Sequence, residues 1–207
     1  MAEKVNISDI KIDCFADKTV KRYIESIADA ESTLRLGNIA AVTAAEAAAM
    51  ALKAIRLTGS EGAALKKAET DCETLRGYFV KIIDEESKSR KPLEKRIAEN
   101  APEKEIECGY LTACIMIDEV LYSSIQMMEV LDRVSDEIAP AAAVYAAAAV
   151  RYARTAMDAV RMIHAVYGER IVEDVCSHTV TREPEIAMDG NAELAETLIG
   201  KFEGMIK

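Results

Sequence analysis

The segment IAAVTAAEAAAMALKAIRL, at residues 39–57, is dominated by alanine, the residue with the highest intrinsic helix propensity. A second alanine-rich segment, APAAAVYAAAAVRYARTAMDAVRMIHAVYG, follows at 139–168. Both segments predict helices whose small side chains let other helices approach closely. Aromatic residues make up only 5% of the chain and tryptophan is absent, which disfavours a β-sandwich because its strands need bulky and β-branched side chains. The sequence therefore predicts an all-α fold.

Further helices are predicted where apolar residues recur at spacings of three and four. Asp17 or Thr19 can cap a short first helix, and a mixed segment near the C-terminus is expected to end at about Gly190. Pro92 is expected to interrupt a long helix and to leave either a charged connector or a short helix with the proline in its first turn, whereas Pro140 is expected to start a helix. The remaining predicted helices span about 63–88, 103–137 and 191–206.

Together these segments predict one domain, residues 1–207, built as a bundle of five or six helices. The broad alanine-rich faces at 39–57 and 139–150 offer more apolar surface than one small bundle needs. We therefore expect the chain to pair with a second copy as a homodimer.

The charge and hydropathy of the chain limit its partners. Its formal net charge of −10 disfavours sequence-independent binding to nucleic acid or to an anionic membrane, both of which depend on clustered lysine and arginine. The first residues, MAEKVNISDIKID at 1–13, contain no apolar signal core, and we find no stretch of the ~20 apolar residues that a membrane span requires. A soluble, cytoplasmic protein without nucleic-acid or membrane partners is expected.

The cysteines and histidines give little sign of catalysis or metal binding. Neither His164 nor His178 has an acidic or thiol partner at helical metal-ligand spacing, so no metal site is predicted. His164 is interpreted as a partly buried helix histidine with its hydrogen bonds satisfied, a catalytic role being the alternative, and His178 as a loop residue. The five cysteines form no CxxC pair and are expected to be buried, reduced thiols; they are Cys14, Cys72, Cys108, Cys114 and Cys176.

Two features are candidates for a functional site. Gly37 and Asn38 open the first alanine-rich helix; Asn38 is a good N-cap, and the free N–H groups of a helix N-terminus can hold a carboxylate or phosphate. The acidic run at 84–87, which includes Glu86, lies on the last turns of the next predicted helix. An ordinary helix cap and a solvated acidic surface are the alternative interpretations.

In the order of their segments and in the residue composition of each, residues 18–168 resemble the cyclodeaminase/cyclohydrolase family. This family comprises formiminotetrahydrofolate cyclodeaminase and methenyltetrahydrofolate cyclohydrolases. Members of that family have a short helix, a glycine-rich loop and an alanine-rich helix ending in Ala-Arg-Leu-Thr. The corresponding stretches here are VKRYIESIAD at 20–29, LRLGN at 34–38 and a helix that ends AIRLT at 54–58. The run DEESKSR at 84–90 resembles an acidic signature on the family's third helix.

The resemblance implies an all-helical dimer with a folate-binding cleft beside the loop. It implies a tetrahydrofolate one-carbon adduct, or a related small molecule, as the substrate, with no covalently bound cofactor. On this hypothesis Glu86 is the catalytic acid or base, and Gly37 and Asn38 hold a polar or anionic group of the ligand.

The loop departs from the family pattern, since Arg35 and Leu36 replace two glycines and Asn38 replaces a serine. Glycine gives a backbone freedom and space for a ligand that arginine and leucine remove. The alternative hypothesis is therefore a non-catalytic binding module or assembly subunit that kept the fold and lost the site.

Overall fold

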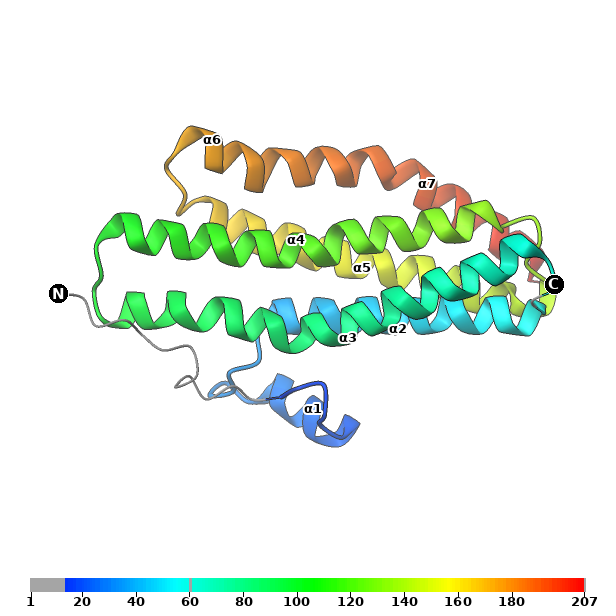
Figure 1. Cartoon of the computed structure of the whole chain (residues 1–207), viewed down its shortest axis with the longest axis horizontal. Coiled ribbons are helices and arrows are strands. Elements are labelled where there is room, and N and C mark those ends of the chain that lie inside the picture. The colour runs from blue at the N-terminus through cyan, green and yellow to red at the C-terminus, as the bar shows by residue number, and fades with distance from the viewer. Residues whose placement is uncertain (1–13, 60, 207) are drawn as a thin grey trace.

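The chain is described by a computed structural model at residues 14–59 and 61–206, and every regular element among these residues is a helix (Figure 1). The predicted all-α class is confirmed; residues 1–13, in which no apolar signal core was found, lie outside the described residues. The elements are α1 (Val20–Ala28), α2 (Leu36–Thr58), α3 (Ala63–Ala98), α4 (Glu103–Arg133), the 3-10 turn η2 (Pro140–Ala142), α5 (Ala143–Gly168), α6 (Asp174–Ser177), the π-helical turn η3 (His178–Arg182) and α7 (Glu183–Met205).

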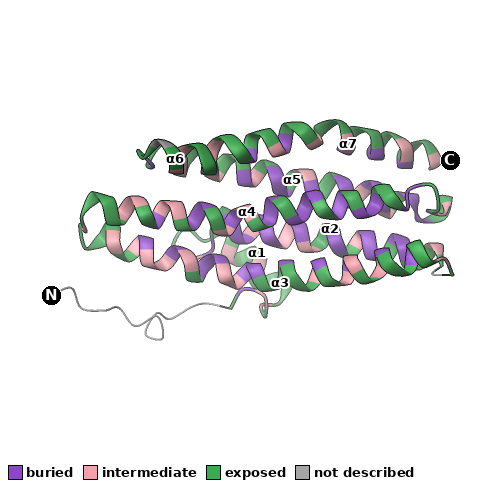
Figure 2. Cartoon of the chain, turned by 45° about the horizontal axis from the view of Figure 1, so that its top comes forward, coloured by how far each residue is buried: buried purple, intermediate pink, exposed green. Residues whose placement is uncertain are grey.

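Four long helices form the centre of the bundle. α2 packs against α3 and α5, and α4 packs against α3 and α5 in turn, so that the four helices close around one core. α7 lies over α5 and α4, while α1 lies outside the four-helix bundle (Figure 1). The buried residues gather on the inward faces of these helices (Figure 2). α2 and α5 are in extensive contact, and both carry fully buried small side chains that allow close packing, such as Ala44, Ala48, Ala146 and Ala149.

The alanine-rich faces of α2 and α5 are thus buried against each other within one chain. The surface that suggested a homodimer is therefore already covered within one chain. The homodimer stays a prediction. Apolar residues are left exposed on α1 instead, where Val20 is 80% and Ile24 57% accessible. The cap predicted for this helix is Thr19, whose hydroxyl accepts a hydrogen bond from the N–H of Arg22 at 3.4 Å.

The prediction that Pro92 interrupts the third helix is wrong. α3 continues through Pro92 to Ala98, and the turn after Pro92 is held to the bundle by the buried side chain of Leu93. A proline inside a helix removes one backbone hydrogen bond and crowds the carbonyl four residues earlier, here that of Lys88. Tertiary packing of the flanking residues therefore outweighs the local preference of the proline.

Replacing Pro92 with alanine is expected to raise the free energy of unfolding, by up to about 3 kcal/mol, because alanine restores the missing hydrogen bond and removes the clash. Urea titration of the two proteins measures the difference. Pro102 is exposed at the N-cap of α4, where a proline removes no intrahelical hydrogen bond. Pro102→Ala should therefore change the free energy of unfolding little. Equal effects of the two substitutions would contradict this interpretation of Pro92.

Two other predicted boundaries are corrected. α2 begins at Leu36, so Asn38 lies inside its first turn and Arg35 occupies the N-cap position. The mixed segment does not extend to Gly190, because α7 begins at Glu183 and includes that glycine. A single glycine in a helix costs only about 1 kcal/mol, which the packing of Met188 and neighbouring buried residues on α5 offsets.

Two helices, α2 and α4, are long and apolar enough to cross a membrane by length and composition alone, which the sequence analysis did not anticipate. In their most apolar windows, 61% and 50% of the residues are buried inside the bundle. Core helices of soluble proteins pass the same test, so these two helices are weak evidence for a membrane span. The expected absence of a membrane partner stays a prediction.

Candidate functional site

A cavity of about 250 Å³ lies at the start of α2, where α3, α4 and α5 also meet. It contains two of the three residues proposed from the sequence, Gly37 and Glu86, although they belong to different helices. The lining residues are Arg35, Leu36, Gly37, Glu86, Ala113, Ile117, Met162, Ile163, Val166 and Tyr167. Most of this lining is apolar, and Glu86 brings a carboxyl group into it.

Glu86 is not the solvated surface carboxylate of the alternative interpretation, since only 6% of the residue is exposed. Its Oε1 accepts a hydrogen bond from Nε of Arg90, one helical turn later, at 3.1 Å. Its Oε2 is buried and has no hydrogen-bond partner among the described residues. Burial raises the pKa of the Glu86 carboxyl, and the nearby Arg90 guanidinium offsets part of that rise.

Arg90 is the largest fully buried side chain of the described residues. Besides Glu86, its guanidinium pairs with the half-exposed Glu94 and donates a hydrogen bond to the Thr33 carbonyl oxygen at 2.9 Å. The ion pair therefore ties the segment before α2 to α3. The spacing of Glu86 and Arg90 was visible in the sequence, but nothing local indicated that the pair is buried.

A glycine is needed at position 37 because a side chain would have no room there, and not because the backbone conformation demands one. Its φ angle is not among the positive values, which the described glycines adopt only at Gly59. A Cβ atom at Gly37 would lie 2.7–2.9 Å from Oε1, Cγ and Cδ of Glu86, closer than real contacts allow. The Glu86 carboxyl thus rests against the first turn of α2, whose free N–H groups and positive dipole end favour negative charge.

Asn38 is fully buried and does not line the cavity. Its side-chain amide donates hydrogen bonds to the Ile83 carbonyl oxygen at 2.6 Å and to Oγ of Ser87 at 2.9 Å. Its Oδ1 accepts one from the N–H of Arg35 at 2.9 Å. The amide is used in joining α2 to α3, so Asn38 positions the loop and is not free to contact a ligand, unlike the role expected from the sequence.

Tyr167 is a cavity residue that the sequence analysis missed. Its ring lies edge-to-face against Tyr110 of α4, with the ring centroids 5.3 Å apart, and burial raises the pKa of its hydroxyl. Tyr167, Ile163 and Val166 lie on one face of α5, and their helical spacing was visible. Only the tertiary structure shows that this face looks toward Glu86.

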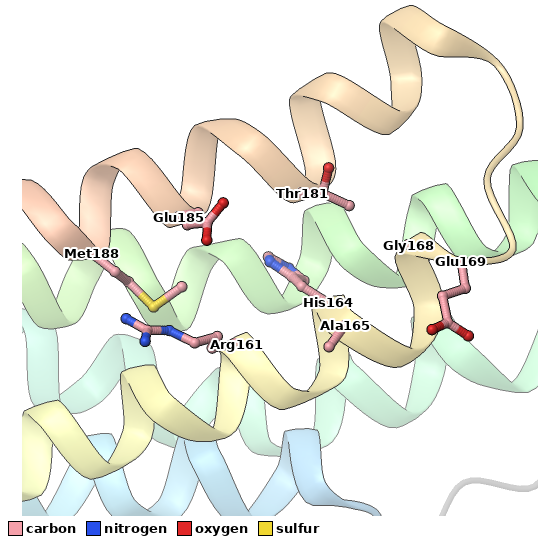
Figure 3. A pocket seen from close by; sticks show the side chains of 8 residues that line it. All are labelled: Arg161, His164, Ala165, Gly168, Glu169, Thr181, Glu185 and Met188. Atoms are coloured by element: carbon pink, nitrogen blue, oxygen red, sulfur yellow. The ribbon is translucent and has the colours of Figure 1, made fainter.

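A second cavity, of about 390 Å³, lies between α5, η3 and the start of α7, and Figure 3 shows the side chains around it. His164 is 4% exposed and lines this cavity. Its Nε2 lies 3.0 Å from Oδ1 of Asp118 on α4, and this contact offsets part of the rise that burial causes in the pKa of the Asp118 carboxyl. His164 is thus a buried helix histidine with one partner, which comes from α4 and not from its own helix, and its Nδ1 has no hydrogen-bond partner among the described residues.

The other residues considered for catalysis or metal binding, His178 and the five cysteines, do not form a functional site among the described residues. His178 lies in η3 and is exposed, so it is not a loop residue as predicted. All five cysteines are free thiols, but Cys14 and Cys108 are exposed, which corrects the expectation that all are buried. Burial raises the pKa of Cys72 and Cys114 to about 12, which leaves both as inert thiols at neutral pH. Among the described residues, no cluster of three or more histidine, cysteine or acidic side chains is arranged to hold a metal ion.

A search of solved structures supports the fold family that the sequence resembles. The chain is similar to formiminotetrahydrofolate cyclodeaminase from Thermotoga maritima, with a TM-score of 0.78 over 92% of this chain and 96% of that one, at 12% sequence identity. No protein-family model and no curated protein sequence matches the chain. The chain therefore shares the fold of a folate cyclodeaminase.

Proposed function

We propose that the protein acts on a tetrahydrofolate one-carbon adduct, or a closely related small molecule, in the cavity at the start of α2. The observation that carries the proposal is the buried carboxyl of Glu86 in the cavity wall. Burial raises the pKa of this carboxyl above its usual value, which is the direction in which a carboxyl group becomes better suited to general acid or base catalysis. The likeness in fold to a folate cyclodeaminase supports the choice of substrate class.

The proposed chemistry is proton transfer during closure or opening of a one-carbon bridge. In closure, a folate nitrogen attacks the formimino carbon, the bond from that carbon to the departing nitrogen breaks, and ammonia leaves. The departing nitrogen must gain two protons, one of which can be the proton that the attacking nitrogen loses. Glu86 is suited to carrying such a proton, and in opening it would deprotonate the water that adds to the methenyl carbon.

The other residues of the site would bind and position the ligand. Gly37 gives the Glu86 carboxyl room against the first turn of α2, and the N–H groups of that turn would favour a polar or anionic group of the ligand beside it. Asn38 and Arg90 hold this turn and Glu86 in place. The cavity of about 250 Å³ is slightly smaller than the 300–1,000 Å³ typical of sites for drug-sized ligands, so part of a folate would extend along the surface.

The proposal is tested by thermal shift with folates and polyglutamyl folates, because a ligand that binds only the folded state raises the melting temperature. Turnover is followed as formation or loss of the methenyltetrahydrofolate chromophore. We expect Glu86→Gln to lower kcat by about 10²–10⁴-fold while folate still raises the melting temperature. Glu85→Gln is the control, because the neighbouring Glu85 lies outside the cavity lining.

The alternative, a non-catalytic binding module, is favoured by one observation, namely that Glu86 is already paired with Arg90. It predicts no turnover by the wild-type protein. A thermal shift without turnover would support folate binding alone, and neither a shift nor turnover at saturating folate would overturn the proposed function.

A further inference from the structure

A third cavity, of about 450 Å³, lies in the groove between the second half of α2 and α3. It is separate from the proposed folate site, because Ala49, its first residue on α2, lies about 18 Å along the helix axis from Gly37. Figure 1 shows this part of α2 beside the first half of α3, at the right-hand end of the bundle. Its volume is within the usual range for small-molecule sites.

Positive charge is in excess in the lining of this cavity. The basic residues are Lys53, Arg56 and Arg76, and the acidic residue is Glu73. The chain as a whole has a formal net charge of −10, and the proposed folate cavity is lined by one arginine and one glutamate. A cleft with a local excess of basic groups attracts anions and repels cations. The third cavity therefore favours an anionic ligand.

The two arginines keep hydrogen-bond donors free at the cavity. Arg56 donates through Nε to Glu69 at 2.8 Å and through Nη2 to Glu73 at 3.2 Å. Arg76 donates to Glu73 through Nη2 alone. Among the described residues, Nη1 of Arg56 and both Nε and Nη1 of Arg76 have no acceptor. Both side chains are partly exposed, so a ligand in the cavity can reach these groups.

Lys53 supplies the charge that the carboxylates leave unbalanced. Glu69 and Glu73 balance two of the three cations, and Lys53 makes no ion pair among the described residues. Its ammonium lies 4.2 Å from the ring centroid of Tyr145 on α5. One positive charge is therefore left over, which matches a ligand with a single negative charge.

The apolar part of the lining indicates what the rest of the ligand is. Ala49, Leu52 and Leu57 lie on the same face of α2 as the basic residues. Leu57 is 55% exposed, which is unusual for a large apolar side chain beside a cavity. An organic group that covers Leu57 and the rim of Leu52 would remove apolar surface from water. A carboxylate joined to an apolar group fits both halves of the lining.

We propose that this cavity is a second ligand site, which binds a small organic monocarboxylate. The carboxylate accepts hydrogen bonds from the free N–H groups of Arg56 and Arg76, whose planar guanidinium groups suit its two oxygens. The Lys53 ammonium attracts it across the cavity, and the apolar group packs on Leu52 and Leu57. This site is independent of folate turnover, and either proposal can fail alone.

Methyl groups report on this cavity and on the folate site separately. Leu52 and Leu57 line the third cavity, whereas Ile117 and Ile163 line the proposed folate site. The ¹³C-methyl-labelled full-length protein is titrated by NMR with benzoate and with benzylamine, which are similar in size and opposite in charge, at constant pH and low ionic strength. We expect benzoate to shift the two leucine signals in a saturable manner and to leave the two isoleucine signals unchanged. Benzylamine should shift none of the four.

Variants establish that charge in this cavity holds the carboxylate. Glu73→Gln should strengthen benzoate binding by about 1.5–5-fold, because it removes the carboxylate that repels the ligand, and misfolding cannot produce such a gain. Lys53→Met should weaken binding by about 1.5–5-fold, since methionine keeps an apolar stem and loses the charge. Lys81→Met is the matched control, because Lys81 is also an exposed helix lysine and lies outside this cavity.

Three results would each overturn the proposal. Benzoate could leave Leu52 and Leu57 unshifted at millimolar concentration, or benzylamine could shift them as strongly. Glu73→Gln, Lys53→Met and Lys81→Met could also all bind benzoate like the wild type. In the first case the basic residues would serve only to balance the carbonyl groups at the C-terminal end of α2, which favour cations.

Discussion

Replacing Arg90 with methionine is expected to lower the free energy of unfolding by about 3–5 kcal/mol, because the change leaves the Glu86 carboxylate buried without its partner. The same change also removes the hydrogen bond to the Thr33 carbonyl oxygen that holds the segment before α2. Chemical denaturation followed by circular dichroism measures the loss. The matched control is Arg133→Met, since Arg133 makes an ion pair with Asp71 at the same 3.1 Å but is exposed.

In the control variant the free energy of unfolding should fall by at most about 1 kcal/mol, because an exposed ion pair contributes no more than that. The double variant Arg90→Met, Glu86→Gln should regain much of the loss, because the glutamine carries no charge to be left unpaired. Equal losses for the two arginines, or no recovery in the double variant, would show that the buried pair contributes no more than a surface one.

The pH dependence of Arg90→Met provides an independent check of the same explanation. Burial raises the pKa of Glu86 in the folded protein, and Arg90 opposes that rise, so the pKa should rise further in the variant. A carboxyl group with a raised folded pKa binds its proton more tightly when folded, so stability falls as pH rises from the unfolded pKa through the folded one. The loss caused by Arg90→Met should therefore be smaller in mildly acidic buffer than in mildly alkaline buffer.

Gly37→Ala is expected to destabilise the protein, by about 1–3 kcal/mol, because the new methyl group would overlap the Glu86 side chain. Glu86 cannot easily move aside, since it is buried and held by Arg90. The substitution should also displace the carboxyl group from the cavity. The activation free energy of folate turnover should therefore rise by more than the free energy of unfolding falls.

Gly77→Ala is the matched control for this substitution. Gly77 also lies in a helix, and a Cβ atom there would meet nothing within 4 Å. Alanine is favoured over glycine inside a helix, so Gly77→Ala should raise the free energy of unfolding by about 0.5–1 kcal/mol. If both variants shift the denaturation midpoint in the same direction, steric contact between residue 37 and Glu86 is not what requires the glycine.

The sequence by itself determined the helical class and most of the helices. Alanine propensity and apolar spacing act within a few residues, so α2, α5 and the cap at Thr19, one of two candidates, follow from local physics. The sequence also pointed to the glycine-containing loop and to the acidic run; Gly37 and Glu86 line one cavity, and their roles there stay a prediction.

Only the tertiary structure decided the rest, because burial and contacts between helices are not encoded within one turn. It carried α3 through Pro92, where packing of the next turn outweighs the proline. The packing of the helices also buries Glu86, one residue of the acidic run, in an ion pair with Arg90. It also brought His164 and Asp118 together from different helices, a pairing that no spacing along a single helix could reveal.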